Sequence, residues 1–430
     1  MRFNFLACAI ALSTVVSVSV DAEGRYTFYK DVAPILQENC QECHRPAGAN
    51  FGGMIAPMSL IRYEEVRPWA KSIIKQIQSR EMPPWDADAK HKGQFRNERT
   101  LEDSEIALIT QWVDSGAPRG NPKDAPVPRT FEAFEGWMIG EPDLIVAMPE
   151  PYHVSDDVYD QYTAFSVDLS DADLPEDVWI TSFQCKPGSK IIHHFNCHLL
   201  PPTDGKLPPA RDKPESSTIS PQGAGSYIGG ISSGSDPVQW PEGFGIPLKR
   251  GTRVTFDIHY HKEAGPGTAV DDLSHIGFTL TDEKPVRELG GSSPMMHFNI
   301  NIAPGQERYK IGPISQILED DIEVIGYMPH MHMRGKEAKF EAIYPDGTEE
   351  VLLYVPRYDF AWQTVYYNNV LKVLPKGTKV QYTAWYDNSE PYSQQRGFDS
   401  NETVRFGQKS SDEMMMGFMI SAKIENTESD

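Results

Sequence analysis

Two cysteines and a histidine near the start of the chain could hold a covalent cofactor. They form the run Cys40-Gln41-Glu42-Cys43-His44, in which two thiols can bond to haem vinyl groups and the adjacent imidazole can bind the iron. A thioredoxin-like dithiol would need a strand–helix–strand context, and half of a zinc site would need a second ligand pair. The sequence offers neither. We therefore predict one covalent c-type haem, held by Cys40, Cys43 and His44.

A methionine is expected as the second axial ligand, because a thioether raises the iron potential and suits electron transfer. Met82 is the preferred candidate, since the two prolines that follow it fix an extended chain. Met54 and Met58 compete with it. Residues 25–120 resemble the small monohaem cytochromes c, in which a Met-Pro element carries the axial thioether. The resemblance implies a small all-α domain.

Apolar periodicity in the same region predicts helices. Between Ser59 and Ile77, apolar residues recur at spacings of three and four, which indicates a helix with one buried face. A second helix is expected to follow, with Thr100 and Asp103 as its capping pair. Gly116 stands where the C-terminal cap of that helix belongs.

Histidines gather in the second half of the chain. Six of the 12 form three groups, His193-His194, His259-Tyr260-His261 and His330-Met331-His332. The surrounding runs are rich in β-branched and aromatic residues and predict strands. Residues two apart on a strand point to the same side, so His330 and His332 can bind one metal ion. His193 and His194 can do so only if their strand ends or bulges there.

The order of these groups resembles the copper monooxygenases that hydroxylate peptidylglycine and dopamine. In that family, an adjacent His-His and a later His before Tyr bind the electron-transfer copper, while a His-x-His and a Met in an acidic segment bind the copper that activates oxygen. The matching residues are His193, His194 and His259 for the first copper, and His330, His332 and Met414 for the second. Nearby residues that remain alternatives or supporting groups are His198, His261, Met415 and Met416. A thioether favours Cu(I), whereas zinc has little use for a methionine.

The resemblance implies an enzyme with two coppers and one haem that inserts one atom of molecular oxygen into a C–H bond. His330, His332 and Met414 would be the catalytic residues, and electrons from ascorbate or a redox protein could pass through the haem. Peptide-amidating relatives bind the substrate carboxylate with an Arg and a Tyr, but the matching positions here are Met328 and Phe418. The organic substrate is therefore unidentified and expected to be less anionic. The alternative is a non-enzymatic periplasmic electron-transfer or copper-binding protein.

The whole chain sets further limits. Its 430 residues carry a formal net charge of −21, which disfavours a nucleic-acid partner. Arg2, an apolar run to Val20 and small residues before Glu23 read as a secretory signal peptide, so we predict an exported, periplasmic protein. No later stretch is apolar enough to span a membrane. Cys185 and Cys197 could form a disulfide, which the sequence leaves open.

The predicted fold is multidomain: a small all-α cytochrome c domain followed by two antiparallel β-sandwich, jelly-roll-like domains. Short strand-like runs separated by Pro, Gly and Asp clusters support the β part. The expected boundaries are a signal peptide at 1–22, the cytochrome c domain at 23–120, a Pro-rich linker at 121–134, and copper-binding β-domains at 135–288 and 289–430.

Overall fold

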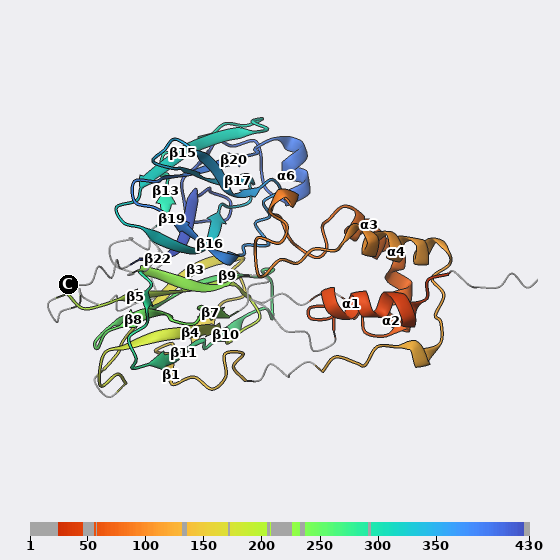
Figure 1. The fold of residues 1–430 in the computed structure, drawn as a ribbon, viewed down its shortest axis with the longest axis horizontal. Coiled ribbons are helices and arrows are strands. Elements are labelled where there is room, and N and C mark those ends of the chain that lie inside the picture. The colour runs from red at the N-terminus through yellow and green to blue at the C-terminus, as the bar shows by residue number, and fades with distance from the viewer. Residues whose placement is uncertain are drawn as a thin grey trace, which may run out of the picture.

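The structure is a computed structural model, and it describes most of the chain between residues 25 and 424. The described ranges are 25–45, 56, 58–130, 136–170, 173–203, 207, 226–232, 237–290 and 294–424. The predicted signal peptide, Met54 and residues 131–134 of the predicted linker lie outside them. The N-terminal helices gather at one end of the molecule, whereas helix α6 (Glu390–Arg396) lies with the strands (Figure 1).

Most of the N-terminal helices pack around Phe28, Leu36 and Trp112, but the turn Ala89–His91 lies against the C-terminal sheets, where the Tyr354 N–H donates to Nε2 of His91 at 3.0 Å. The N-terminal helices are η1 (Phe28–Val32), α1 (Ala33–Asn39), α2 (Tyr63–Val66), η2 (Arg67–Trp69), α3 (Ala70–Gln78), η3 (Ala89–His91), α4 (Asp103–Asp114) and η4 (Pro122–Asp124). The first of these is a π-helix and the other η elements are 3-10 helices. The helix expected between residues 59 and 77 is thus three short pieces, with a 3-10 turn at Pro68, which has no N–H to donate to the preceding turn.

The capping pair predicted for α4 is wrong. The capping box joins Glu102 and Glu105, and the Glu102 N–H donates to Glu105 Oε2 at 2.8 Å. Thr100 is unavailable because its hydroxyl donates to Glu98 at 2.7 Å. Gly116 does follow the helix with a φ of 95°, the left-handed conformation that a C-terminal cap requires.

Two sheets share the apolar core around Phe183, Phe195 and Phe256. The first sheet has six strands, β1 (Leu144–Ala147), β4 (Val178–Lys186), β7 (Val238–Gln239), β8 (Phe244–Leu248), β11 (His275–Thr281) and β12 (Arg287–Glu288). The second has four, in the order β3 (Asp160–Asp168), β9 (Arg253–His261), β5 (Ile192–Leu200) and β6 (Ser226–Ser232). A separate pair joins β2 (Tyr152–Val154) to β10 (Val270–Asp272).

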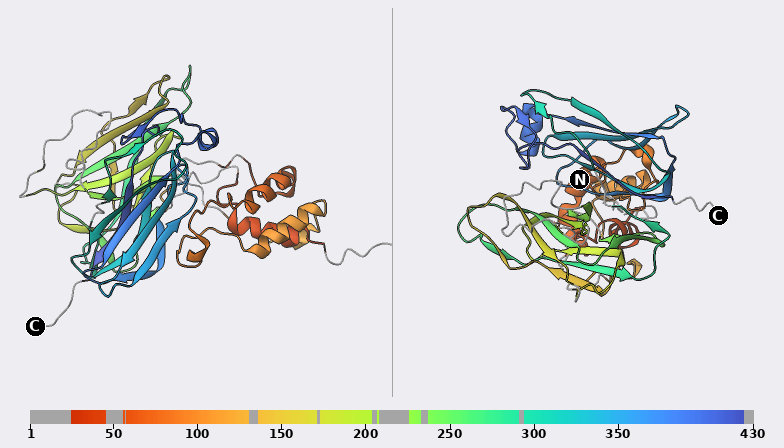
Figure 2. Two further views of the ribbon diagram at one scale, coloured as in Figure 1. Left: turned by 90° about the horizontal axis from the view of Figure 1, so that it is seen from above. Right: turned by 90° about the vertical axis from the view of Figure 1, so that its left-hand side faces the viewer.

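The C-terminal strands build another two sheets around Phe340, Tyr382 and Tyr386. One has the order β13 (Met295–Met296), β22 (Met416–Lys423), β16 (Ile322–His330) and β19 (Tyr366–Leu374). The other has the order β15 (Tyr309–Ile317), β20 (Lys379–Tyr386), β17 (Gly335–Ile343) and β18 (Glu349–Val355). The remaining elements are the pair β14 (Asn301–Ile302) with β21 (Val404–Arg405), and helix α6 (Glu390–Arg396). The two groups of sheets lie against each other, and the helices project from one side (Figure 2).

The predicted fold class is wrong. The molecule is mostly β, with 39% strand and 15% helix, and its strands are spread over several small sheets. The first group is not purely antiparallel, because β12 runs parallel to β8. Its core also takes in Ile420 and Ala422 from β22, so the two groups of strands share buried surface instead of forming separate sandwiches. Periodicity reveals that a strand face is apolar, but it does not reveal which neighbour covers that face.

The N-terminal helices also do not make an independent all-α domain. Between α3 and α4 the chain leaves the helices, and Trp85 and Phe95 are buried in the core of the C-terminal sheets. Phe95 forms an antiparallel bridge with Asn368 on β19. The Arg96 N–H donates to the Tyr367 carbonyl at 2.8 Å. Within the described ranges, no helix is both long enough and apolar enough to cross a membrane.

Candidate metal centres

The first histidine group is built by neighbouring strands. His193 and His194 lie on β5, and His259 lies on β9, which pairs with β5 in antiparallel fashion. The register shifts between Ile192, opposite Tyr260, and His194, opposite His259. His193 is the extra residue of this bulge. This is the irregularity that an adjacent pair needs if both rings are to face one point.

The three imidazoles of this group come close together. The candidate ligand atoms of His193, His194 and His259 all lie within 4.8 Å of one another. The ring centroids of His259 are 5.0 Å from those of His193 and 4.8 Å from those of His194. Burial, followed by the neighbouring histidines, lowers the pKa of His193 to about 3 and that of His194 well below its ordinary value. Burial also lowers the pKa of His259, although the hydrogen bond to Asp160 opposes the shift. Burial thus favours the neutral form of all three rings, which is the form that binds metal.

Asp160 and Tyr162, which no sequence motif indicated, complete this site. Asp160 on β3 hydrogen-bonds Nε2 of His259 and lies 3.5 Å from Nδ1 of His261. The Tyr162 ring stacks on His259 with centroids 3.9 Å apart and planes 7° apart. His259 is fully buried, and its Nδ1 has no hydrogen-bond partner among the described residues. A second possible ligand group is Asp160, His259 and His261; His261 is the more exposed alternative to His259.

The second histidine pair lies at the end of β16. His330 is the last residue of that strand, and its ring centroid is 5.3 Å from that of His332, with the planes at 89°. Nδ1 of His330 donates to Gln363 Oε1 at 2.8 Å, and Nδ1 of His332 lies 3.3 Å from the Asp412 carbonyl. Burial lowers the pKa of both rings. With Nδ1 engaged in each case, Nε2 is left as the lone-pair donor.

Glu413 fastens the methionine-bearing segment to this pair. Its buried carboxyl group accepts hydrogen bonds from the backbone N–H of His332 at 2.9 Å and of Arg334 at 2.6 Å. Met414 follows directly, half-buried, and its carbonyl accepts from the Tyr386 hydroxyl at 2.7 Å. The predicted thioether thus belongs to a segment that is fixed against the His330–His332 turn.

The three neighbouring methionines go to different places. Met415 is fully buried in the core of the C-terminal sheets, and Met416 packs beside Phe418 and Met328. Met414 and Met416 are both half-buried, so burial disfavours only Met415 as a ligand.

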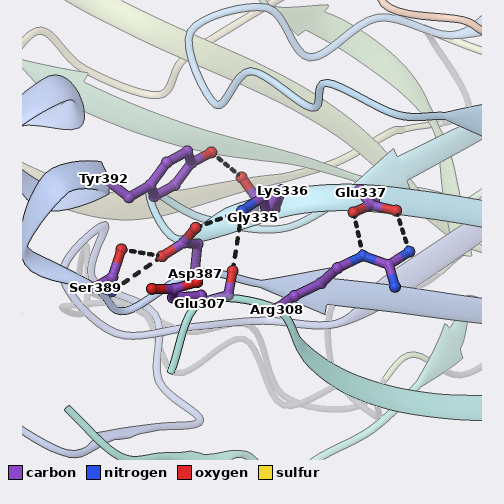
Figure 3. Close-up of polar contacts among 8 residues, drawn as sticks. All are labelled: Glu307, Arg308, Gly335, Lys336, Glu337, Asp387, Ser389 and Tyr392. Atoms are coloured by element: carbon purple, nitrogen blue, oxygen red, sulfur yellow. Dashed lines mark hydrogen bonds and ion pairs between the residues drawn. The ribbon is translucent and has the colours of Figure 1, made fainter. Parts of the chain in front are cut away.

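The chain that follows His332 is held by a polar network (Figure 3). Lys336 donates to Asp387 at 2.5 Å, and the Tyr392 hydroxyl donates to the Gly335 carbonyl at 2.7 Å. Arg308 makes two parallel bonds to Glu337, at 2.6 and 2.8 Å. Such fork-shaped pairs fix geometry as well as charge. The start of β17, and with it the turn that carries His332, is therefore firmly placed.

Three of the predicted haem ligands, Cys40, Cys43 and His44, follow the end of α1. Cys40 caps that helix, and neither Cys40 nor Cys43 is joined in a disulfide among the described residues. Nδ1 of His44 donates to the Met58 carbonyl at 3.2 Å, and burial lowers the pKa of this ring. The Met58 main chain thus lies on the Nδ1 side, away from the Nε2 that would bind iron. Met82 follows α3 with 38% of its surface exposed.

Other residues singled out in the sequence take structural places. Cys185 and Cys197 are buried free thiols in the first core, so no disulfide joins them. His198 lies 3.7 Å from Asp257 rather than in the three-imidazole group. Met328 and Phe418 form a small buried cluster with Tyr227, whose hydroxyl lies 3.5 Å from the Met328 sulfur.

Comparisons with known proteins add little to this geometry. Neither a family model nor a curated protein matches the chain. Among solved structures, the chain is similar to the cowpea mosaic virus top component, naturally occurring empty particles, at 8% identity over 67% of this chain and 91% of that chain, with a TM-score of 0.30. It is also similar to the infectious bursal disease virus VP2 subviral particle, at 9% identity over 67% and 74% of the two chains, with a TM-score of 0.18. Overlaps this poor define neither a fold family nor a function.

Proposed function

We propose that this protein is an exported haem- and copper-dependent monooxygenase that hydroxylates a C–H bond of an organic substrate with molecular oxygen. The observation that carries the proposal is the group His193, His194 and His259, whose ligand atoms lie within 4.8 Å of one another. Nδ1 of His259 is buried without a partner among the described residues, which costs about 1–3 kcal/mol. A metal ion bound by the three neutral imidazoles would satisfy it.

The residues of both centres fit copper. Bound copper would supply one-electron transfer and oxygen chemistry. Asp160 accepts the Nε2 proton of His259 and so turns Nδ1 towards the other two histidines. Gln363 fixes the His330 ring in the same way, leaving Nε2 of that ring for the metal. A soft thioether from Met414 suits Cu(I), the state that must meet oxygen.

The N-terminal segment supports a haem that delivers electrons. Cys40 and Cys43 would be attached to the haem, and His44 would bind iron through Nε2 because Nδ1 already donates to a carbonyl. Met82 stays the preferred second axial ligand. The electron donor, ascorbate or a redox protein, would reduce the copper centres by way of this haem.

The surroundings of the second centre support an apolar substrate. Met328 precedes His330 by two residues and packs with Phe418 and Tyr227, each less than 10% exposed. None of these three side chains carries a charge that could bind a carboxylate. A substrate with a neutral or apolar group near the reacting C–H bond is therefore favoured over a C-terminal glycine peptide.

Metal analysis of the full-length protein, together with its haem spectrum, tests the proposal. We expect about two coppers and one haem per chain. His194→Ala should lose about one copper and the hydroxylated product while keeping the haem spectrum. The matched control is His153→Ala, which changes an exposed histidine paired with Asp271. Zinc at both centres contradicts the proposal. Copper without any oxygen-dependent product would favour the non-enzymatic electron-transfer protein instead.

A further inference from the structure

One side chain lies between the two histidine centres. Phe360 belongs to the segment between β18 and β19. Its ring stacks on His193, with centroids 5.1 Å apart and planes at 22°, and it meets His332 edge-on at 5.7 Å and 71°. His193 comes from the first group of sheets and His332 from the second. A single aromatic ring therefore contacts a predicted ligand of each centre.

The chain around Phe360 is tied to the second centre. Gln363, which is 3% exposed, donates from Nε2 to the Phe360 carbonyl at 3.0 Å and accepts at Oε1 from Nδ1 of His330 at 2.8 Å. The Tyr358 hydroxyl accepts from the Met331 N–H at 3.1 Å and donates to the Met331 carbonyl at 2.7 Å. A displacement of Phe360 would therefore also move the turn that carries His330 and His332.

This contact has an energetic consequence. Phe360 is half-buried and its ring packs against both imidazoles, so a shift of one imidazole changes the packing of the ring against the other. A metal ion bound at the first centre would restrict His193 and, through the ring contact, Phe360. A second ion then meets a His332 ring that is already ordered and loses less conformational entropy on binding.

We propose that Phe360 and Gln363 are positioning residues that couple the two centres, so that metal bound at the first raises the affinity of the second. This inference rests on the proposed function, because it requires both centres to bind metal. Its consequence for that function is protective: the oxygen-activating centre would be filled chiefly in molecules whose electron-supplying centre is already loaded. A second centre loaded alone would lack the second of the two electrons that hydroxylation consumes, and such molecules would then be rare.

The test is a thermodynamic cycle on the full-length, haem-loaded protein. The dissociation constant of Cu(II) at the second centre is measured by titration, with the EPR spectrum identifying the centre, when the first centre is loaded and when His259→Ala disables it. We expect loading to tighten the second centre about 5–150-fold. The coupling ratio is the dissociation constant of the second centre with the first centre disabled, divided by that with the first centre loaded. Phe360→Leu should bring this ratio towards one while both centres still bind copper. Phe360→Tyr, which keeps the ring, should have the wild-type ratio.

Controls separate the coupling from the proposed function. Phe406→Leu changes a partly buried phenylalanine whose ring meets Phe298 instead, and it should keep the wild-type ratio. If Phe360→Leu does not fold, Gln363→Leu removes the link to His330 and should lower the ratio equally. An unchanged ratio in these variants, with both centres binding, overturns the coupling alone. Wild-type protein that binds no metal overturns the coupling and the proposed function together.

Discussion

Asp160 holds three groups of the first centre at once. It hydrogen-bonds Nε2 of His259, lies 3.5 Å from Nδ1 of His261, and accepts from the Ser410 hydroxyl at 3.2 Å. Burial opposes its charged form, but the hydrogen bonds from the two histidines outweigh burial and hold the pKa of Asp160 well below its ordinary value. The carboxylate is therefore ionised at neutral pH. It orients His259 and ties this centre to the segment that leads to Met414.

Replacing that carboxylate should weaken metal binding without removing a histidine. We expect Asp160→Asn to lower the copper affinity of the first centre about 10–100-fold, the usual effect of losing the partner of a ligating histidine. Calorimetric titration measures it. Asp168 lies on the same strand as Asp160 and pairs with Arg253 on β9, and Asp168→Asn should leave the copper affinity unchanged. Equal affinities in Asp160→Asn and wild type would show that the carboxylate does not support the site.

The sequence could predict groups that recur in short motifs but not those that converge from distant strands. The order of the histidine groups led to His193, His194 and His259, and the structure brings these together. Asp160 and Phe360 stand in ordinary strand and loop sequences with no spacing that marks them. Their proximity to the histidines depends on the pairing of β3 with β9 and on the path between β18 and β19, which local pattern does not specify.

At the scale of elements, the segment between α3 and α4 attaches the helical part to the sheets. The Asn369 N–H donates to the Gln94 carbonyl at 2.7 Å, and the Arg96 N–H donates to the Tyr367 carbonyl at 2.8 Å. The Asn97 side chain adds a bond to the Val365 carbonyl at 2.7 Å. These contacts extend along the exposed edge of β19, so this part of the chain behaves as an added edge segment.

Phe95 should anchor that segment. Its ring is 3% exposed and packs against Trp85 and Tyr366. Phe95→Ala should therefore cost about 3–5 kcal/mol of stability, the usual loss for a buried phenylalanine, and open this part of the chain to proteolysis. Urea unfolding and limited proteolysis measure the two effects. Phe298→Ala, at a site 57% exposed, should do neither. If Phe95→Ala loses no more stability than Phe298→Ala, the Phe95 ring does not stabilise the core.

The same segment explains why the fold was only partly predictable. Apolar spacing indicated helices where α3 and α4 lie, and the runs rich in β-branched and aromatic residues around the histidine groups indicated strands where β5, β9 and β16 lie. The wrong inference was that helices between residues 23 and 120 would bury their own apolar residues. Trp85 and Phe95 are covered by the C-terminal sheets instead, and nothing in their immediate sequence indicates a partner more than 250 positions away.

At the scale of the whole molecule, charged residues line the junction between helices and sheets. Arg357 donates to the carbonyls of Ser79 and Arg80 at 2.9 and 3.0 Å. Half-buried Asp86 lies among Asp359, Glu81, Arg357 and Arg396. Burial, followed by repulsion from Asp359, raises the pKa of Asp86 to about 7, although the two arginines partly oppose the rise. The junction therefore contains a carboxyl group that ionises near neutral pH.

This raised pKa gives the junction a pH dependence with a definite sign. The protonated form of Asp86 is favoured in the folded molecule, so its contribution is fully present below about pH 4 and declines as the pH rises to about 7. Asp86→Asn keeps the group neutral. The variant should match wild type at pH 4 and exceed its stability by roughly 1–3 kcal/mol at pH 8, as measured by urea unfolding followed through tryptophan fluorescence. Asp88→Asn, which preserves the cap on the Lys90 N–H, should reproduce the wild-type profile. Parallel profiles for Asp86→Asn and wild type would mean that this carboxyl group does not govern how the helices hold to the sheets.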